Sequence, residues 1–397
     1  MAHHEVLIVG GGSAGLAVGA MLRNQANPPA VTIVDPSEKH YYQPIWTLVG
    51  AGVFPKEISE REEADYIPPG ATWIKQAVAT FDPDNNAITL ANGETHTYQV
   101  LVVTAGIQIN WDAVDGLKES VGKPGTGVCS NYAFETVEST WANIKSLKKG
   151  TAIFTEPNTP IKCGGAPQKI TYLACDHWRR SNVRSKIDVQ FCKGGVGIFA
   201  VKKYADALNK VLERHGIHTN WNKNLVAVDA NKKEAVFQDL ESGDHTSMSF
   251  DMIHVTPPQG PPNFIKNSPL AAETGWVEVD KHTTQHTRYA NVFSLGDCSN
   301  LPTSKTGAAI RKQAPTTTAN IMAFLAGQEL PKQYNGYTSC PLVTGYGSLI
   351  LAEFDYDKQP MESFPFNQAE ERYSMYALKA YALPKMYWHG MLRGREF

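Results

Sequence analysis

Residues 5 to 15 read E-V-L-I-V-G-G-G-S-A-G, a mostly apolar run that ends in three consecutive glycines. A continuous apolar run is typical of a strand buried in a parallel sheet. The segment 13–23 then predicts a helix, and V-T-I-V-D at 31–35 predicts a second buried strand. Strand, glycine loop, helix and strand form a βαβ unit, which predicts a parallel sheet with right-handed crossovers.

The glycine loop has the spacing of a dinucleotide site. The first glycine permits a tight turn, the second a close approach of the backbone to a pyrophosphate, and the third close helix packing. The free N–H groups at the start of the helix favour phosphate. Asp35 follows about twenty residues after the loop, where a carboxylate accepts hydrogen bonds from a ribose. The loop residues that we expect to bind the cofactor are Gly10, Gly12, Ser13, Ala14 and Gly15.

The composition describes a globular chain of 397 residues, of which 42% are hydrophobic and 19% charged. This length allows two or more domains. The net charge of −2 lacks the basic excess typical of nucleic-acid binding, so we expect no nucleic-acid partner. We expect no membrane-spanning helix, since no apolar run reaches about 18 residues. Because a strand begins within a few residues of the N-terminus, we also expect no signal or transit peptide.

A second α/β region begins at T-A-I-F (151–154), and N-V-F-S-L-G-D (291–297) returns to a buried strand. The elements expected after 151–154 are a helix over 166–180, a strand over 187–191 and a helix over 202–214. We predict an α/β fold of two Rossmann-like domains in tandem, the first interrupted by a second, degenerate one. The expected bounds are 1–110 with 285–335 for the first, 111–284 for the second, and 336–397 for a C-terminal amphipathic region.

Two strand ends favour FAD as the cofactor, T-A-G (104–106) and L-G-D (295–297). Together they resemble the flavoproteins with two dinucleotide-binding domains. The resemblance implies that Asp297 bonds the ribityl chain and that a helix starting near Thr306, over about 307–326, points its N-terminus at the flavin pyrimidine. The alternative for Lys305 is a solvated loop lysine. The further cofactor-binding residues expected are Pro44, Ala105, Gly106, Gly296, Asp297, Lys305 and Thr306.

The stretch P-I-K-C-G-G-A-P-Q (160–168) stands where a nicotinamide-binding glycine loop would lie. Its glycines come too late and its prolines are too stiff for a pyrophosphate turn, so we expect no electrons from a nicotinamide. Instead it carries Cys163 just before a predicted helix, where a thiol tends toward the thiolate. Cys340 lies in a second turn-rich stretch, 336–346. The alternative for either cysteine alone is a buried apolar residue.

No metal site is expected. The histidine pairs His215/His218 and His282/His286 have no nearby cysteine, and no C-x-x-C pair is present. Six cysteines in a chain of this length are no disulfide scaffold.

Six blocks resemble sulfide:quinone oxidoreductases, particularly the animal mitochondrial-like type. They are Y-Q-P-I-W-T-L-V-G-A-G, I-K-C-G-G-A-P-Q-K, V-K-K-Y-A-D-A-L, H-V-T-P-P, L-G-D-C-S-N-L-P-T-S-K-T and Y-T-S-C-P-L-V-T-G-Y. The resemblance implies that Cys163 and Cys340 form a disulfide, or a sulfur-bridged version of it, beside the flavin. Sulfide attacks Cys340, leaving a persulfide and releasing Cys163 as a thiolate. Sulfite, glutathione or another thiol removes the outer sulfur, and two electrons pass through FAD to ubiquinone or menaquinone.

Three further residues are candidates under this resemblance. Cys129 is a possible third redox cysteine, with a plain packed thiol as the alternative. Tyr346 and Phe354 are candidates for flanking the quinone ring.

The C-terminal stretch alternates aromatic and apolar residues with basic ones, and we expect Pro384 to split it into two short helices. Such a region suits a bilayer interface; the alternative is a helix packed on the protein's own sheet. The resemblance implies a peripheral protein of the bacterial plasma membrane (cytoplasmic face) or the mitochondrial inner membrane. The aromatic residues concerned are Tyr373, Tyr376, Tyr381, Tyr387 and Trp388.

Three other functions stay open from the sequence: a flavocytochrome-c-type sulfide dehydrogenase, an NADH:quinone oxidoreductase-like flavoprotein, and a flavin-binding sensor of sulfide. The missing nicotinamide loop argues against the second.

Overall fold

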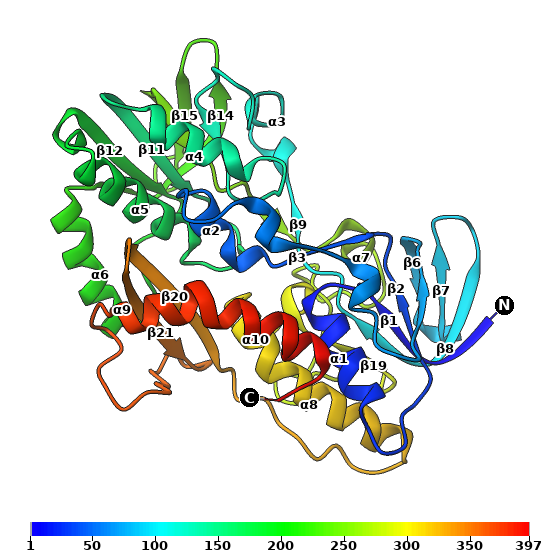
Figure 1. The fold of residues 1–397 in the computed structure, drawn as a ribbon. Helices are drawn as coiled ribbons and strands as arrows, with labels where there is room; N and C mark the ends of the chain where they lie inside the picture. Colours follow the sequence, from blue (N-terminus) through cyan, green and yellow to red (C-terminus); the bar gives the residue numbers. More distant parts are fainter. Residues whose placement is uncertain (1, 397) are drawn as a thin grey trace.

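The opening apolar run forms β1 (Ala2–Val9), an inner strand of a seven-stranded sheet in the computed structural model, which describes residues 2–396 (Figure 1). It pairs in parallel with the strands on both sides, and α1 (Ser13–Arg23) connects it to the next one. The other strands of this first lobe are β2 (Val31–Val34), β5 (Thr72–Ile74), β6 (Val78–Asp82), β7 (Ala87–Leu90), β8 (Thr95–Val103) and β19 (Val292–Ser294).

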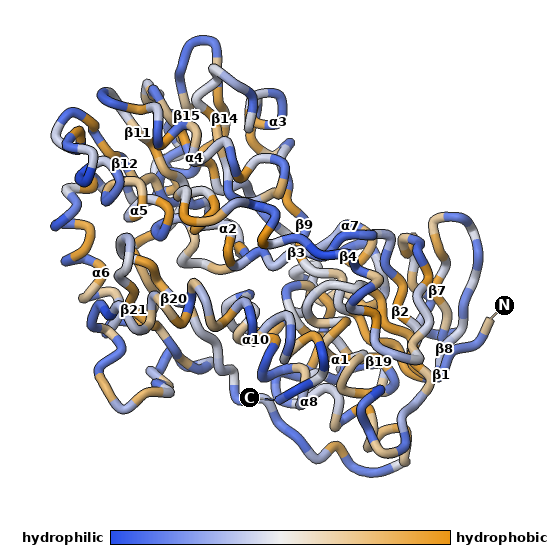
Figure 2. Tube along the Cα trace, in the orientation of Figure 1, coloured by the Kyte–Doolittle hydropathy of each residue, from blue (hydrophilic) through white to orange (hydrophobic). Residues whose placement is uncertain are grey.

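β19 returns to the first sheet after an excursion of nearly two hundred residues and pairs in parallel with β8. α8 (Gly307–Leu325) follows and packs against α1. The interruption of the first domain by a second one is therefore as the sequence predicts. The inner strands are continuous hydrophobic stretches in Figure 2, as strands covered on both faces must be.

The second lobe is a five-stranded sheet whose paired strands all run parallel. The predicted helices and the strand appear close to the expected bounds. The strands are β10 (Val128–Cys129), β17 (Met252–His254), β11 (Gly150–Glu156), β12 (Ile187–Lys193) and β13 (His218–Trp221). The helices are α4 (Val137–Ser146), α5 (Ala166–Arg180) and α6 (Lys202–His215). An antiparallel sheet adjoins them, formed by β14 (Lys223–Asp229), β15 (Glu234–Asp239) and β16 (His245–Ser249).

The lobes are joined by β9 (Gln108–Ile109) and β18 (Gln259–Gly260), which pair with each other. Beyond this crossing, α7 (Asn263–Lys266) and residues up to 279 pack on the first sheet, because their apolar side chains cover Leu7 and Val9. The return to the first domain therefore lies near 260 and not at the expected 285. The remaining short elements are β3 (Lys39–Tyr41), β4 (Glu60–Glu62), α2 (Trp46–Val49) and α3 (Leu117–Ser120).

The C-terminal region spans both lobes (Figure 1). Its hairpin, β20 (Thr338–Gly345) and β21 (Ser348–Phe354), packs on α5. Its helical end, α9 (Tyr373–Ala377) and α10 (Leu383–His389), reaches α1 through residues 391–393. No helix within 2–396 is long and apolar enough to cross a membrane.

Pro384 does not split this helical end, which corrects the expectation. A π-helical turn over 378–382 joins α9 to α10, and Pro384 sits in the first turn of α10. In the first turn of a helix, a proline without an N–H removes few helical hydrogen bonds. The wider π-helical turn before it accommodates the hydrogen bond that the proline cannot make. Tyr376, Tyr387 and Trp388 are buried against the protein itself, whereas Tyr373 and Tyr381 are 69% and 53% exposed.

Candidate functional site

The glycine loop between β1 and α1 is tightly folded. Gly10 adopts φ +104°, which favours glycine, and a Cβ on Gly15 would stand 1.9 Å from the Gly10 carbonyl oxygen. A Cβ on Gly12 would meet nothing within 4 Å, so the loop faces open space at the N-terminus of α1. Ser13 and Ala14 form the first turn there. The loop therefore has the shape and free N–H groups that a pyrophosphate needs.

Asp35 follows β2, as expected, and its carboxylate bonds to the glycine loop. One of its carboxylate oxygens accepts the Gly11 N–H at 2.6 Å, and the other accepts the Ser37 N–H at 2.7 Å. Asp35 thus also holds the glycine loop against the end of β2. Trp73 donates its indole N–H to the Asp35 carbonyl at 3.0 Å, which fixes this position further.

The second half of the cradle lies at the ends of β8 and β19. Gly296, Asp297, Lys305 and Thr306 line one small pocket, and Ala105 with Gly106 follows β8. Thr306 caps α8 by accepting the Ala309 N–H at 3.1 Å. This confirms the expected start of the helix.

Asp297 and Lys305 are both partly buried. Burial raises the pKa of the Asp297 carboxyl, and the nearby Lys305 and Lys162 oppose this. Lys305 donates to the backbone carbonyls of Asp297 at 2.6 Å and Ser299 at 3.1 Å, and lies 3.7 Å from the centre of the Trp276 ring. Lys305 is therefore no solvated loop lysine. Sequence reasoning missed Trp276, for which no pattern gave a signal.

The cradle fits a dinucleotide that runs from α1 to α8. A Cβ on Gly12, on Gly106 or on Gly307 would in each case meet nothing within 4 Å, although each lies at the end of a strand or the start of a helix. Gly12 would hold the pyrophosphate, and Asp297 and Thr306 would hold the flavin end. Pro44 lies beside the site, where its carbonyl accepts a hydrogen bond from Lys379.

Cys163 stands at the flavin end of this cradle. Its backbone N–H donates to the Lys305 carbonyl at 2.8 Å, and Lys162 and Lys305 form an isolated parallel bridge. Cys163 adopts φ +56°, a left-handed conformation that is uncommon for a side chain with a Cβ and is often found at functional sites. The proline-rich loop therefore places a thiol at the position where the sequence lacks a nicotinamide-binding glycine loop.

The fold brings Cys163 and Cys340 together, although 336–346 lies in a different region. Cys340 is buried in β20, opposite Ala352. A hydrogen bond with Cys340 lowers the pKa of the Cys163 thiol well below its ordinary value, and Lys169 and Lys379 add to this. The same bond, together with burial, raises the pKa of the Cys340 thiol well above its ordinary value. One sulfur is thus poised as a thiolate and the other as a thiol.

Two lysines serve this pair. Lys169, in the first turns of α5, places Nζ 3.0 Å from the Cys163 sulfur. Lys379 comes from the π-helical turn, and burial lowers its pKa to about 7. The block K-C-G-G-A-P-Q-K contains Lys169, but its role was not predicted, and Lys379 stood in a run that indicated only a membrane surface.

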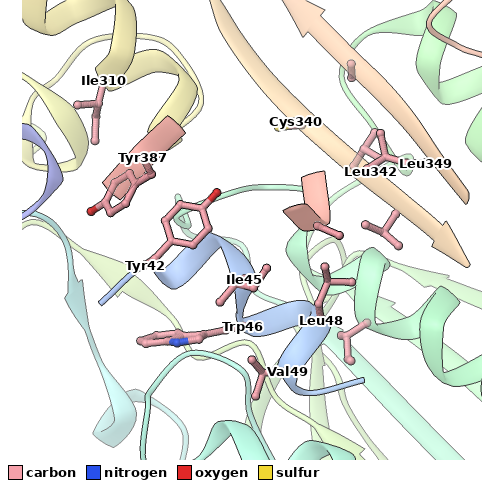
Figure 3. Close-up of a cluster of buried hydrophobic side chains, with 14 of the residues drawn as sticks. Tyr42, Ile45, Trp46, Leu48, Val49, Ile310, Cys340, Leu342, Leu349 and Tyr387 are labelled. Carbon is pink, nitrogen blue, oxygen red and sulfur yellow. The ribbon is translucent and has the colours of Figure 1, made fainter. Parts of the chain in front are cut away.

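Two tyrosines, Tyr42 and Tyr387, also line this site. Figure 3 shows the rings of Tyr42 and Tyr387 side by side, with centroids 4.6 Å apart. Burial raises the pKa of the Tyr42 hydroxyl, and the charge on Cys163 adds to this. Residues 42–45, which follow β3, thus line the site together with the C-terminal helix.

Cys129 lies apart from this chemistry. It is buried within β10, its sulfur contacts the Ile253 carbonyl at 3.4 Å, and burial raises its pKa to about 12. A thiol held in this way is poorly reactive. The geometry favours the packed-thiol alternative.

Tyr346 and Phe354 do not flank one ring. Tyr346 lies in the turn of the hairpin, beside Ser348, and its hydroxyl donates to the Ala51 carbonyl at 2.6 Å. Phe354 ends β21, six residues from Ser348, which puts it roughly 20 Å away at the usual rise of a strand. Tyr346 bonds to Ala51, just after α2, and its turn lies beside Tyr373 of α9, whereas Phe354 packs on Phe199. Only one of them is able to contact a given quinone ring.

Comparison with known proteins agrees with this arrangement. The pyridine nucleotide-disulphide oxidoreductase family model matches residues 4–144 and 198–320. A mitochondrial sulfide:quinone oxidoreductase of Dictyostelium discoideum is 49% identical over 396 residues, covering 99% of this chain and 87% of the relative. The Mus musculus protein of the same name is 46% identical over 393 residues, with the same coverage.

Among solved structures, the sulfide:quinone oxidoreductase of Aquifex aeolicus superposes with a TM-score of 0.83 at 17% identity. The match covers 100% of this chain and 92% of that one, and it shows the shared fold. The paired thiols beside a dinucleotide cradle, the family model and the two close relatives agree: the chain belongs to the sulfide:quinone oxidoreductases, within the pyridine nucleotide-disulphide oxidoreductase family.

Proposed function

We propose that this protein is an FAD enzyme that oxidises hydrogen sulfide to sulfane sulfur and passes the electrons to quinone. The observation that carries the proposal is the placement of Cys163 and Cys340 in contact, beside Asp297 and Lys305 at the flavin end of the cradle. FAD, when bound, supplies a two-electron acceptor that is reoxidised by quinone.

We assign the roles of the two thiols from Lys169, whose Nζ lies 3.0 Å from the Cys163 sulfur. In the oxidised enzyme the two sulfurs are joined, and the hydrosulfide anion attacks Cys340. The bond to Cys163 breaks, Cys340 carries the persulfide, and Cys163 leaves as a thiolate. The leaving sulfur is the one with the lowered pKa, as thiol–disulfide exchange favours. Lys169 and Lys379 stabilise the negative charge that results.

A small sulfur acceptor then completes the cycle. A sulfite or thiolate anion takes the outer sulfur from Cys340 and leaves two reduced cysteines. The two cysteines re-form their bond by giving up two protons and two electrons, which FAD, when bound, would accept and pass to quinone. The lysines around Cys163 also favour the approach of an anionic substrate or acceptor.

We place the enzyme on a membrane surface, as a peripheral protein of the mitochondrial inner membrane or the bacterial plasma membrane. The relatives carry the name mitochondrial. Tyr373 and Tyr381, exposed on the C-terminal helices, support contact with the bilayer interface. Tyr346 lies beside these helices and is the better of the two candidates for the quinone site.

The test is a spectrum followed by turnover. Purified protein with bound flavin is mixed anaerobically with sulfide or with NADH, and decylubiquinone is then added. Bleaching of the flavin by sulfide alone, with reoxidation by the quinone, is expected. Bleaching by NADH alone would overturn the proposal, and sulfide bleaching without quinone reduction would point to a haem partner.

A further inference from the structure

A chain of buried hydrogen bonds joins the glycine loop to the C-terminal helix. The Ser13 hydroxyl lies 2.7 Å from the Tyr387 hydroxyl, which lies 2.5 Å from Nε2 of His40. Nδ1 of His40 lies 2.9 Å from a carboxylate oxygen of Glu63. His40, Glu63 and Tyr387 are only 4%, 2% and 6% exposed. The residues come from four separate segments, so only the fold assembles this chain.

The chain of hydrogen bonds both begins and ends at the glycine loop. The second carboxylate oxygen of Glu63 is buried and has no hydrogen-bond partner within residues 2–396. It lies 2.6 Å from the place where a Cβ on Gly11 would stand. The four side chains therefore enclose the glycine loop from Ser13 on one side to Glu63 on the other. A buried carboxylate oxygen left in this state requires a reason in the function of the site.

The position of Tyr387 is fixed from outside the chain as well. Trp388 packs the edge of its ring on His40, with centroids 5.6 Å apart. Beyond α10, the Arg393 carbonyl accepts a hydrogen bond from Asn24 at 2.9 Å, at the end of α1. Gly394, at φ +70°, packs directly on the backbone of α1. These contacts hold the C-terminal helix on the helix that receives the phosphates.

We propose that Tyr387 is a positioning residue for FAD, which acts through Ser13 and makes the C-terminal helix a functional part of the flavin site. The inference rests on the FAD enzyme proposed above. Ser13 occupies the first turn of α1, next to the open space at Gly12, where its hydroxyl would meet the pyrophosphate of bound FAD.

The direction of the hydrogen bonds decides whether Ser13 donates to a phosphate. When both nitrogens of His40 carry hydrogen, one donates to Glu63 and the other to Tyr387. Tyr387 then donates to Ser13, whose own O–H is free to point at a phosphate oxygen. When only Nδ1 carries hydrogen, Nε2 accepts from Tyr387, Tyr387 accepts from Ser13, and no hydrogen remains for the phosphate.

FAD binding therefore favours the state of the His40–Glu63 pair that holds one more proton. The other charged or titratable groups around the chain lie on several elements. They are Asp35, which faces Glu63, Tyr66, which stacks on His40, Tyr42, whose ring packs on Tyr387, Arg61, which lies over Trp388, and Arg393, which lies over Tyr66. None of them interrupts the chain. The consequence is proton uptake on FAD binding, with an affinity that falls as pH rises.

The experiment titrates apoprotein with FAD by calorimetry or flavin fluorescence between pH 6 and 8, in buffers of different ionisation enthalpy. Wild type is expected to take up protons. Tyr387→Phe keeps the ring but cuts the chain and leaves the Ser13 O–H free at every pH, so it is expected to abolish the proton uptake and the pH dependence, and to bind FAD about tenfold more tightly than wild type at pH 8. Tyr376→Phe is the matched control, because its hydroxyl makes no hydrogen bond to another described residue, and it is expected to bind as wild type does.

Ser13→Ala provides the second arm. If Tyr387 acts through Ser13, Tyr387→Phe changes neither the affinity for FAD nor the proton uptake in the Ser13→Ala background. Full additivity of the two effects, or a wild-type pH dependence and proton uptake in Tyr387→Phe, overturns the inference and leaves the FAD assignment intact. Failure of wild-type apoprotein to bind FAD at all overturns the proposed function instead. The melting temperature of each apoprotein checks that the variants fold.

Discussion

Nζ of Lys169, in α5, lies 3.0 Å from the sulfur of Cys163, in the loop that precedes this helix. Cys163 thus has a lysine cation close to its sulfur, and the pKa of its thiol is lowered. The pKa of the Cys340 thiol, on the facing hairpin, is raised. This asymmetry yields the first prediction.

Replacing Lys169 with methionine removes this cation, and the pKa of the Cys163 thiol is expected to rise. A rise of about one unit in this pKa moves the midpoint of the alkylation profile about one pH unit higher. The measurement is the pH profile of iodoacetamide alkylation of reduced enzyme, read at Cys163 by mass spectrometry. Lys162→Met is the control, because Lys162 does not contribute to the lowered pKa. An unchanged profile in Lys169→Met would exclude the role given to this lysine.

Cys163→Ala and Cys340→Ala are each expected to abolish sulfide-dependent quinone reduction, because neither sulfur alone can form the bond that sulfide attacks. FAD stays bound in both, since the glycine loop and Asp297 are untouched. Stopped-flow spectra with sulfide and decylubiquinone provide the measurement. Cys129→Ala, which alters a buried thiol in β10, is expected to keep most of the turnover. Near-normal turnover in either of the first two variants would be incompatible with the mechanism.

His254 makes folding sensitive to acid. Burial lowers its pKa from 6.5 to about 3, and its Nε2 accepts the Asn131 N–H at 3.1 Å. Between these pH values only the unfolded chain binds the proton. The stability is therefore complete above pH 6.5 and falls as the pH drops toward 3, by about 1.4 kcal/mol per unit at most. Urea unfolding at pH 7.5 and pH 5 measures the slope. His254→Gln, which keeps an acceptor for Asn131, is expected to lose less stability on acidification than wild type, and an equal loss would refute this.

Tyr346→Leu is expected to raise the KM for decylubiquinone severalfold and to leave the reduction of bound flavin by sulfide unchanged. The reason is that Tyr346 adjoins the exposed end of the C-terminal helices, away from the thiol pair. Phe354→Leu serves as the comparison, because Phe354 lies at the opposite end of the hairpin. A raised quinone KM in Phe354→Leu alone would move the quinone site to that end.

Tyr373 and Tyr381 are the large apolar side chains that the C-terminal helices expose. Changing both to serine is expected to weaken co-sedimentation with phospholipid vesicles about tenfold, since two interfacial aromatic side chains are lost. Val196→Ser, which alters an exposed residue of the second lobe, is the control and is expected to bind vesicles normally. Equal binding by the double variant would show that another surface meets the membrane.

The βαβ unit, the returning strand and the helices near 166 and 307 could be predicted because each has a local signal. Glycine spacing marks the loop that contains Gly10, and an apolar run marks β19. The contact between Cys163 and Cys340 has no local signal, since it depends on how the hairpin packs against α5. The family resemblance, and not the residue pattern, predicted that contact.

The C-terminal end is more deeply buried than its sequence indicates. Its sequence alternates aromatic and basic residues in a way that fits a membrane surface. Tyr387 and Trp388 instead fill the space around His40, and Lys379 turns inward to the thiol pair. A pattern of residue types does not state which neighbour covers it, so it predicted neither Lys379 nor the role of Tyr387.

The hydrogen bond from the Cys163 N–H to the Lys305 carbonyl joins two main-chain groups, so it does not depend on the identity of either side chain. Sequence drift at position 305 leaves the reactive sulfur where it is. The insertion or deletion of one residue between 157 and 166 changes the register of that pairing and moves the sulfur off its target. For placing this sulfur, the length of the loop is therefore a stricter requirement than the identity of most of its residues.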